Sequence, residues 1–289
     1  MKNTTHIILS VLLCGMVFSR ADAQSVKYDV NDDRNVNTAD VVSIYNYIIK
    51  GDAGEDKHHT VSIQVKGISV PMVPVEGGTF MMGATAELEH TSVLEAPAHQ
   101  VTLSSYYIGR TEVTQDLWEA VMGKNPSSTK GTRLPVNNIS WDDCQQFIQK
   151  LNEITGRKFR LPTEAEWEFA ARGGNKSLHY KYCGSNDADE VAWHSGNSDI
   201  QIHNVGTKKA NELGIYDMAG NVREWCQDWD GSYSSDAQTN PTGPSSGTNR
   251  VIRGSVYVLN SECCRPSYRG PMYPGNAQPY TGLRLALDL

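Results

Sequence analysis

The feature that most constrains the fold is a series of four segments, closed by a short fifth, spread over the last two thirds of the chain. In chain order they are GRTEVT at 109–114, RLPTEAEWEFAARGG at 160–174, GIYDMAGNVREW at 214–225, RVIRGS at 250–255 and GLRL at 282–285. The longest carries its own helix signals, because Thr163 and Glu166 make an N-terminal capping box and Gly173 supplies a stop. Pro162 lacks a backbone donor and sits just before the helix start, where that loss is tolerated. This segment is therefore expected to be mainly architectural.

Further helices and strands follow from the same kinds of signal. Thr114 begins a helix that Gly123 ends, and Ser140 begins a second helix that ends at Gly156. Asp143 completes a capping box with Ser140. Four earlier stretches have the apolar or alternating pattern of strands, namely 61–65, 70–75, 79–82 and 100–103. Beyond residue 175 the sequence is dominated by Gly, Asn, Ser and Pro turns, so this half is expected to be loop-rich.

In order and spacing, the five segments resemble those of the formylglycine-generating enzyme family, also called the sulfatase-modifying factor family. The resemblance runs from about Val73 to Leu289, and a series of ordered motifs is more specific than any single short pattern. It implies a compact, loop-rich α+β fold related to C-type lectins. The corresponding domain is predicted to occupy residues 61–289.

The resemblance also points to the residues that perform the family's chemistry. Enzymes of the family oxidise a sulfatase cysteine to formylglycine with copper held by two cysteines that four residues separate. Soft thiolates are the ligands that select Cu(I). The family pattern places the first of these at Val258 and the second at Cys263, and a shift to Cys264 puts Leu259 at the partner position. The copper pair is therefore incomplete, and Cys263 is interpreted as a remnant of the site.

A structural role is the other interpretation of Cys263 and Cys264, as buried thiols or as disulfide partners in an exported protein. Other relatives of the fold bind iron through histidines, two of them four residues apart. No two histidines of this chain have that spacing, which excludes that site and a His-Glu-x-x-His zinc site.

Two functional classes remain open. In the first, the protein is a noncatalytic binding or structural module of an envelope assembly, whose former substrate groove binds a peptide, a glycan or a partner protein. In the second, it is a copper-dependent oxidase that generates formylglycine, with Cys263 and Ser255 as its catalytic residues. The groove is expected to be formed by residues that follow the fourth segment, namely Ser255, Tyr257, Cys263, Arg265 and Tyr268.

A structural calcium ion is implied by the resemblance at the third segment. Carried over by position, Asp217 and Glu224 would supply carboxylates, while Gly220 and Val222 would supply main-chain carbonyls, and oxygen ligands are those that Ca²⁺ prefers. The alternative is that Asp217 and Glu224 cap turns or pair with arginines, namely Arg223 and Arg253.

The N-terminus indicates export. Lys2 precedes an apolar run at 7–18 that is too short to span a bilayer, and small residues at 21–23 suit cleavage, so residues 1–23 are predicted to be a signal peptide. Lipidation at Cys14 is the alternative. The protein is expected to be periplasmic, cell-surface or secreted, and no later segment is expected to span a membrane.

Residues 24–51 carry a second specific pattern, which resembles one dockerin repeat. Oxygen-bearing side chains stand at loop positions 1, 3, 5, 7, 9 and 12, followed by an apolar helical face at 41–48. Arg34 stands where such loops prefer glycine, and only one repeat is present. The segment is predicted to bind calcium, with a polar turn capping a helix as the alternative and a cohesin-like partner implied by the resemblance. The predicted ligands are Asp29, Asn31, Asp33, Asn35, Asn37 and Asp40.

A polar linker is predicted at 52–60. Cleavage after residue 23 would remove Lys2, Arg20 and Asp22 and change the net charge from −7 to −8. An acidic chain repels phosphate backbones, and no basic stripe with interleaved aromatic residues is present, so nucleic acid is not expected as a partner.

Overall fold

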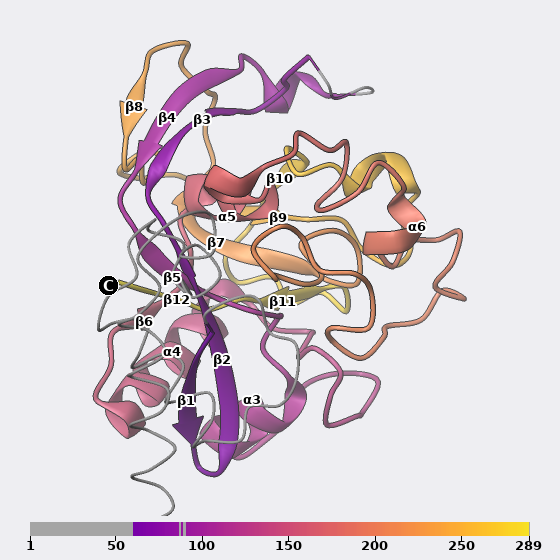
Figure 1. The fold of residues 1–289 in the computed structure, drawn as a ribbon. Helices are drawn as coiled ribbons and strands as arrows, with labels where there is room; N and C mark the ends of the chain where they lie inside the picture. The colour runs from indigo at the N-terminus through magenta and orange to yellow at the C-terminus, as the bar shows by residue number, and fades with distance from the viewer. Residues whose placement is uncertain (1–59, 87, 89–90, 289) are drawn as a thin grey trace, which may run out of the picture. The chain divides into compact units, whose positions relative to one another are not determined.

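The computed structural model describes residues 60–86, 88 and 91–288 (Figure 1). The predicted signal peptide and the predicted calcium loop with its helix lie outside these residues, as does the linker except for Thr60. Those three assignments stay predictions. Along the part of the chain that the structure describes, no helix combines the length and apolar character needed to cross a bilayer.

The first sheet brings the C-terminal end of the chain between earlier strands. Its order is β1-β2-β5-β12-β6, and every neighbouring pair is antiparallel. The inward-facing residues Val65, Met72 and Ile108 are fully buried, as the alternation along a half-buried strand requires. The strands are β1 (Val61–Val65), β2 (Ile68–Val75), β5 (Tyr106–Gly109), β6 (Phe159–Arg160) and β12 (Ala286–Asp288).

Two helices pack against each other beside this sheet, α3 (Gln115–Met122) and α4 (Trp141–Thr155). The predicted stops are confirmed, because Gly123 and Gly156 take left-handed conformations with φ of 77° and 65°. The capping box that begins α4 is confirmed as well. Thr114 is the N-cap of α3, but its hydroxyl bonds to the Asp116 side chain and not to the helix backbone.

Two smaller sheets complete the fold. The four-stranded sheet has the order β10-β9-β7-β11, with β11 parallel to β7, and the three-stranded sheet has the order β3-β4-β8. All four strands predicted from sequence are confirmed to within two residues. The strands of these sheets are β3 (Gly78–Met82), β4 (His99–Leu103), β7 (Arg223–Trp229), β8 (Gln238–Thr239), β9 (Arg250–Arg253), β10 (Arg269–Met272) and β11 (Thr281–Leu283).

Helix α5 (Glu164–Ala171) lies between these sheets and contacts β3, β4, β7 and β9. The predicted capping box of Thr163 and Glu166 is confirmed. Every residue of α5 is buried, including three glutamates. Because buried carboxylates are costly without partners, this helix must be surrounded by cations or donors.

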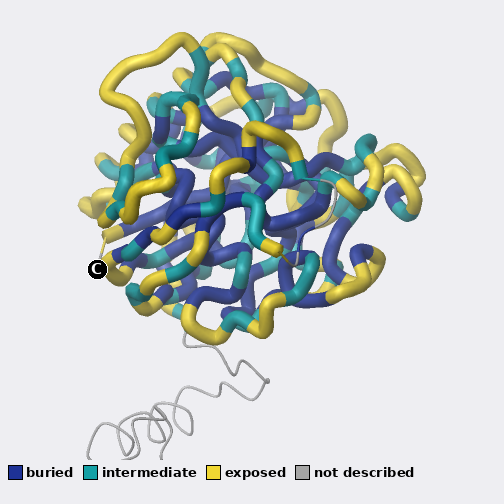
Figure 2. The backbone as a smooth tube through the Cα atoms, turned by 90° about the horizontal axis from the view of Figure 1, so that it is seen from above, coloured by how far each residue is buried: buried dark blue, intermediate teal, exposed yellow. Residues whose placement is uncertain are grey.

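The second half of the domain is loop-rich, as predicted. Regular structure there is limited to short pieces, which include η3 (Gly174–Lys176), α6 (Ala188–Val191) and η4 (Ser261–Cys264). The earlier η2 (Val93–Glu95) belongs to the connection between β3 and β4. Much of the irregular backbone is nevertheless buried, for example at Ala192 and Met218 (Figure 2).

Candidate functional site

The predicted groove residues divide into buried and accessible members. Ser255 follows β9 and is fully buried, with its hydroxyl beside the Cys264 thiol. Arg265 is buried and forms an ion pair with Glu95 at 2.6 Å. Tyr257 and Tyr268 are half-buried. Ser255 and Arg265 therefore support the wall of this region, whereas the two tyrosines can meet a ligand.

The cysteines of η4 do not form a thiol pair at the surface. Cys263 is half-buried and lies beside the Tyr268 hydroxyl. Cys264 is buried, and burial raises the pKa of its thiol to about 12. Val258 occupies the predicted partner position and is also half-buried. All five cysteines of the described residues are free, and of the two in η4 only Cys264 fits the buried-thiol interpretation.

Cys263 belongs, through Tyr268, to a set of aromatic and polar side chains that Arg223 links together. The rings of Tyr257 and Tyr280 lie 6.2 Å apart between centroids at an angle of 62°. The Arg223 guanidinium lies 5.5 Å from the centroid of the Tyr268 ring and donates to its hydroxyl at 3.1 Å. The backbone amide of Arg223 donates to the carbonyl of Tyr280 at 2.8 Å, which joins the pair of Arg223 and Tyr268 to the pair of Tyr257 and Tyr280. We call these five residues the tyrosine surface: Arg223, Tyr257, Cys263, Tyr268 and Tyr280.

Sequence reasoning missed two members of the tyrosine surface, Arg223 as a surface group and Tyr280. Tyr280 is 38% exposed and comes from the connection that precedes β11. Its contact with Tyr257 depends on the parallel pairing of β11 with β7, which no local pattern encodes. The sequence therefore held no signal for this pair.

The third segment places Asp217 and Glu224 in the interior. Glu224 accepts from Arg284 at 2.7 Å and from the indole nitrogen of Trp167 at 2.6 Å. The alternative, in which Glu224 pairs with an arginine, fits this contact, but the arginine is Arg284 of the fifth segment and not Arg223 or Arg253. Residues that are distant in sequence meet here through β7 and β11.

Asp217 accepts from the backbone amide of Gly206 at 2.6 Å, and burial raises its pKa. Gly220 has φ of 76°, and a Cβ there would lie 2.1 Å from the Trp193 carbonyl, so only glycine fits. Val222 is buried. Asp217, Gly220 and Val222 thus belong to one tightly packed turn, and the implied calcium site stays a prediction.

Glu112 lies within the first segment and is a further buried carboxylate. The sequence alone assigned no role to it. One of its oxygens accepts from Asn221 at 3.0 Å, and its carboxyl group lies close enough to that of Asp217 to share a hydrogen bond. Burial and the nearby Asp217 carboxylate raise the pKa of Glu112 well above its usual range. Together with Glu224, these acids lie near one cation, Arg284, and the raised pKa values of Glu112 and Asp217 favour their protonated forms. In the described part of the chain, no three His, Cys, Asp or Glu side chains already form a metal cage.

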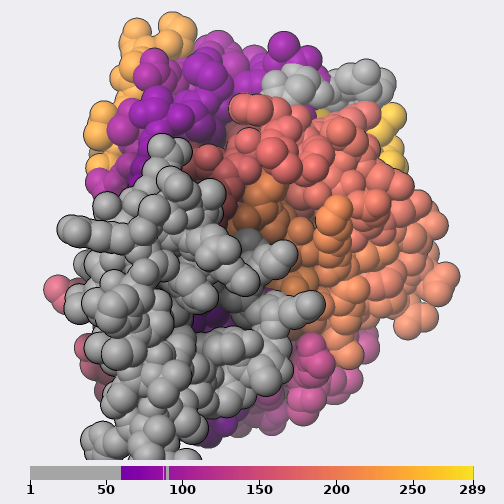
Figure 3. All heavy atoms as spheres, viewed as in Figure 1, coloured from indigo at the N-terminus to yellow at the C-terminus, as the bar shows by residue number. Residues whose placement is uncertain are grey.

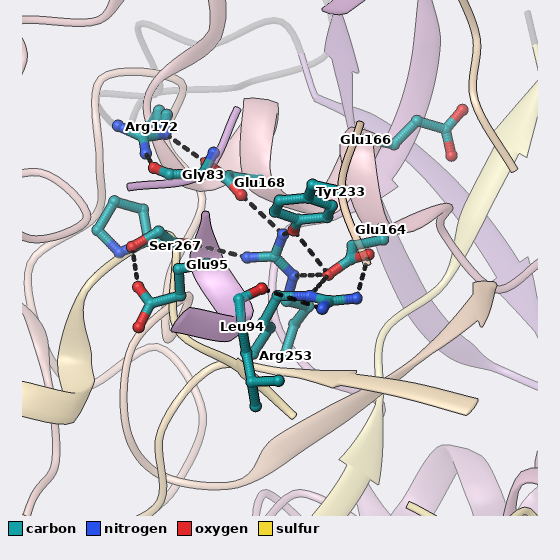
Figure 4. A network of polar contacts seen from close by, with 12 residues as sticks. Gly83, Leu94, Glu95, Glu164, Glu166, Glu168, Arg172, Tyr233, Arg253 and Ser267 are labelled. Carbon is teal, nitrogen blue, oxygen red and sulfur yellow. Dashed lines mark hydrogen bonds and ion pairs between the residues drawn. The ribbon is translucent and has the colours of Figure 1, made fainter. Parts of the chain in front are cut away.

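A second set of buried charges forms what we call the α5 ion-pair layer: Glu164, Glu168, Arg253 and Arg269. Figure 4 shows Arg253 between the two glutamates. Arg253 contacts Glu164 at 2.9 Å and Glu168 at 2.7 Å, and Arg269 contacts Glu164 at 2.6 Å. Burial alone would raise the pKa of Glu164, but the two arginines outweigh burial and lower it. The two arginines of this layer are therefore paired inside the protein and are not available to an anionic ligand.

The fold and these buried networks define a class: domains of mixed helix and sheet that hold much irregular backbone together with internal ion pairs. The chain belongs to the sulfatase-modifying factor family, because residues 60–289 match the sulfatase-modifying factor enzyme 1-like domain. The family resemblance predicted from sequence is thereby confirmed, and the relation to C-type lectins fits this fold family.

Several known proteins are similar to this chain in sequence or in structure. The chain is 35% identical over 268 residues to the chaperone protein LppX of Paenibacillus barcinonensis, which covers 75% of this chain and 89% of LppX. It is 32% identical over 193 residues to the formylglycine-generating enzyme of Thermomonospora curvata, which covers 59% of this chain and 61% of the enzyme. The solved structure of Treponema denticola variable protein 1 matches with a TM-score of 0.74 and 30% identity, over 80% of this chain and 99% of that chain.

Proposed function

We propose that this protein is an exported, noncatalytic binding module of the sulfatase-modifying factor family. The observation that carries the proposal is Val258 at the position of the first copper thiol, which leaves Cys263 without a second sulfur ligand. Two thiolates are what holds Cu(I) in a site of this kind, and an isopropyl group supplies none.

The tyrosine surface supports a binding role. The rings of Tyr257 and Tyr280 meet edge to face, and the Arg223 guanidinium and the Tyr268 phenol are linked to them. Such groups bury large area at little loss of side-chain entropy and offer both apolar and hydrogen-bonding contacts. The ligand that this surface suits best is a peptide segment of a partner protein. The similarity to a relative named as a chaperone is consistent with a protein partner.

Calcium is part of the proposal as a structural ion. Asp217 and Glu112 would supply carboxylate oxygens, with main-chain oxygens from Gly220 and Val222. Both oxygens of Glu224 are engaged by Arg284 and Trp167, so Glu224 would act by holding Arg284 in place. A second calcium ion is proposed for the loop at 29–40, and export for the signal peptide at 1–23.

The copper oxidase is the second candidate. Two observations favour it: the 32% identity to a formylglycine-generating enzyme, and the accessibility of Cys263 beside the Tyr268 hydroxyl. In that case Cys263 would carry the copper with a ligand other than a second cysteine.

The test is turnover. The reduced protein is incubated with copper, O₂ and a Cys-x-Pro-x-Arg peptide, and formylglycine is measured by mass spectrometry beside the Thermomonospora curvata enzyme as positive control. The proposal predicts no product above a copper-only blank. Product that disappears in Cys263→Ser would establish the oxidase instead.

A further inference from the structure

A cavity of about 300 Å³ lies on a part of the molecule that is separate from the tyrosine surface. It opens between the three-stranded sheet and the end of β7, beneath the loop that runs from 230 to 249. In Figure 3 the atoms of this loop region, in orange, lie against those of β3 and β4 at the upper left. A volume of about 300 Å³ is at the lower end of the range for small-molecule sites. The cavity therefore suits one small ring and not a chain.

The floor of the cavity carries little net charge. Glu164 and Arg269 line it, and both belong to the α5 ion-pair layer, in which each acid faces an arginine. Arg172 adds a second cation beside Glu168 at 2.8 Å, and Asp230 adds an acid beside Arg269 at 3.2 Å. Since these charges offset one another, the floor favours neither an anion nor a cation.

Asp228 is the one lining carboxyl group outside these pairs. It is 3% exposed, and one oxygen accepts from the backbone amide of Glu164 at 2.9 Å. Among the described residues no other hydrogen bond reaches this side chain. Burial raises the pKa of Asp228 to about 8, so the group is mostly neutral at pH 7 and can both donate and accept. A buried carboxyl of this kind lacks partners that a ligand hydroxyl can supply.

The walls add fixed aromatic rings. The Arg250 guanidinium lies 3.5 Å over the Trp229 ring, and that of Arg269 lies 4.5 Å over the Tyr233 ring. His99 packs on Tyr233 with 4.8 Å between ring centroids. These stacks hold the rings in place, and their guanidinium groups disfavour a cationic ligand.

The rim is rich in small hydrogen-bonding groups, which are Ser232, Ser234, Gln238 and Thr242. Gly243 beside them has φ of 72°, and a Cβ there would lie 2.9 Å from the Cβ of Asp228. The glycine thus lets the loop close directly over the buried carboxyl.

We propose that this cavity binds a neutral, hydroxyl-rich ring, the chemistry of a single sugar unit, with Asp228 accepting or donating to ring hydroxyls and Trp229 and Tyr233 forming the apolar wall. An uncharged site with aromatic walls, a buried carboxyl and a hydroxyl-bearing rim matches a molecule that has apolar faces and polar edges. The site is independent of the tyrosine surface, because no residue is shared between the two.

The experiment is saturation-transfer NMR on the full chain with methyl glycosides of glucose, galactose, mannose and N-acetylglucosamine. At least one is expected to bind. Thr242→Trp fills the mouth of the cavity. It is expected to weaken that binding at least about tenfold, because the ring can no longer reach the lining groups. Ser246→Trp adds the same bulk to the same exposed loop outside the cavity and is expected to leave binding unchanged.

Choline and acetate serve as small charged probes, and neither is expected to bind at the cavity. The proposal is overturned if none of the four glycosides binds, if binding survives unchanged in Thr242→Trp, or if a charged probe is preferred. Should Thr242→Trp fail to fold by circular dichroism, Gln238→Ala removes a rim amide without added bulk and takes its place. Neither outcome bears on copper or on formylglycine, so failure here is distinct from failure of the proposed function.

Discussion

The α5 ion-pair layer and the tyrosine surface each combine motif residues with residues outside the motifs, yet they differ in almost every physical respect. In the layer, all four charged groups are at most 7% exposed, and each is held by at least two contacts. On the tyrosine surface the side chains are half-buried or exposed, and the Nε of Arg223 has no partner. The buried motif residues thus fix the contacts of the interior, whereas the residues at the surface can differ in their chemistry.

This contrast explains how a chain can match its family along 230 residues and still carry Val258 where the resemblance places a copper thiol. Removal of one member of a buried ion pair leaves an uncompensated charge, which is strongly destabilising. Replacement of a half-buried thiol by valine leaves nothing unpaired. The fold therefore constrains Arg253 tightly, whereas it tolerates Val258.

The largest expected effect is at the α5 ion-pair layer. Arg253→Met is expected to lower the free energy of unfolding by about 3–5 kcal/mol, because Glu164 and Glu168 stay buried without their shared cation. Urea denaturation followed by circular dichroism measures it. Arg157→Met, at an exposed position, is the matched control and is expected to change stability by less than about 0.5 kcal/mol. A loss below about 1 kcal/mol for Arg253→Met would contradict the architectural role of the layer.

A smaller effect on stability is expected when Asp228, which lies next to the α5 ion-pair layer, is replaced. Its folded pKa of about 8 lies above the ordinary value of 3.8, so the folded state binds the proton more tightly than the unfolded state. The associated stability is fully present below about pH 4 and is lost as pH rises towards 8. Asp228→Asn removes this dependence and is expected to be more stable than the wild type at pH 8 by about 1–3 kcal/mol, with little difference at pH 4. Thermal unfolding of both proteins across this pH range measures it, and parallel profiles would disprove the assignment.

The surplus acid at Glu112 links the interior to calcium. With a chelator present, Glu112→Gln is expected to stabilise the protein by about 1 kcal/mol, because it removes one of three buried carboxylates around Arg284. With millimolar calcium, the wild type is expected to gain thermal stability and the variant to gain less. Differential scanning calorimetry under both conditions separates the two effects. Equal calcium shifts in the two proteins would remove Glu112 from the proposed site.

The smallest effect on stability is expected at the tyrosine surface. Tyr280→Ala is expected to change the free energy of unfolding by less than about 0.5 kcal/mol, because the ring is exposed and its structural contact is through the backbone. Loss of binding in a peptide array, without loss of stability, would confirm a surface specialised for ligands. A stability loss comparable to that of Arg253→Met would abolish the contrast between the two regions.

Local signals in the sequence predicted the local structure well. The capping boxes at Ser140 and Thr163, the stop at Gly156 and the early strands could be predicted because each is encoded within a few residues. The partner of Glu224 could not, because Arg284 is 60 residues away and arrives through the parallel pairing of β11 with β7. The contact between Glu112 and Asn221 spans 109 residues and was equally hidden.

The candidate site shows the same division. The incomplete copper pair depends on the spacing of Val258 and Cys263 alone, and it stays a prediction. The burial of Ser255 and Arg265 could not be predicted, because it depends on packing against Glu95 and other distant residues. The cavity beside Asp228 also had no sequence signal, because its lining comes from several strands and loops far apart in the chain.

The most direct test of the central claim is Cu(I) titration of the reduced wild-type protein beside Val258→Cys, which restores the second thiol. The account predicts no stoichiometric copper in the wild type and a gain of about one equivalent in the variant, since two thiolates suit Cu(I) where one does not. Tight binding of one equivalent by the wild type, lost in Cys263→Ser, would contradict the claim that this surface has given up the family's chemistry.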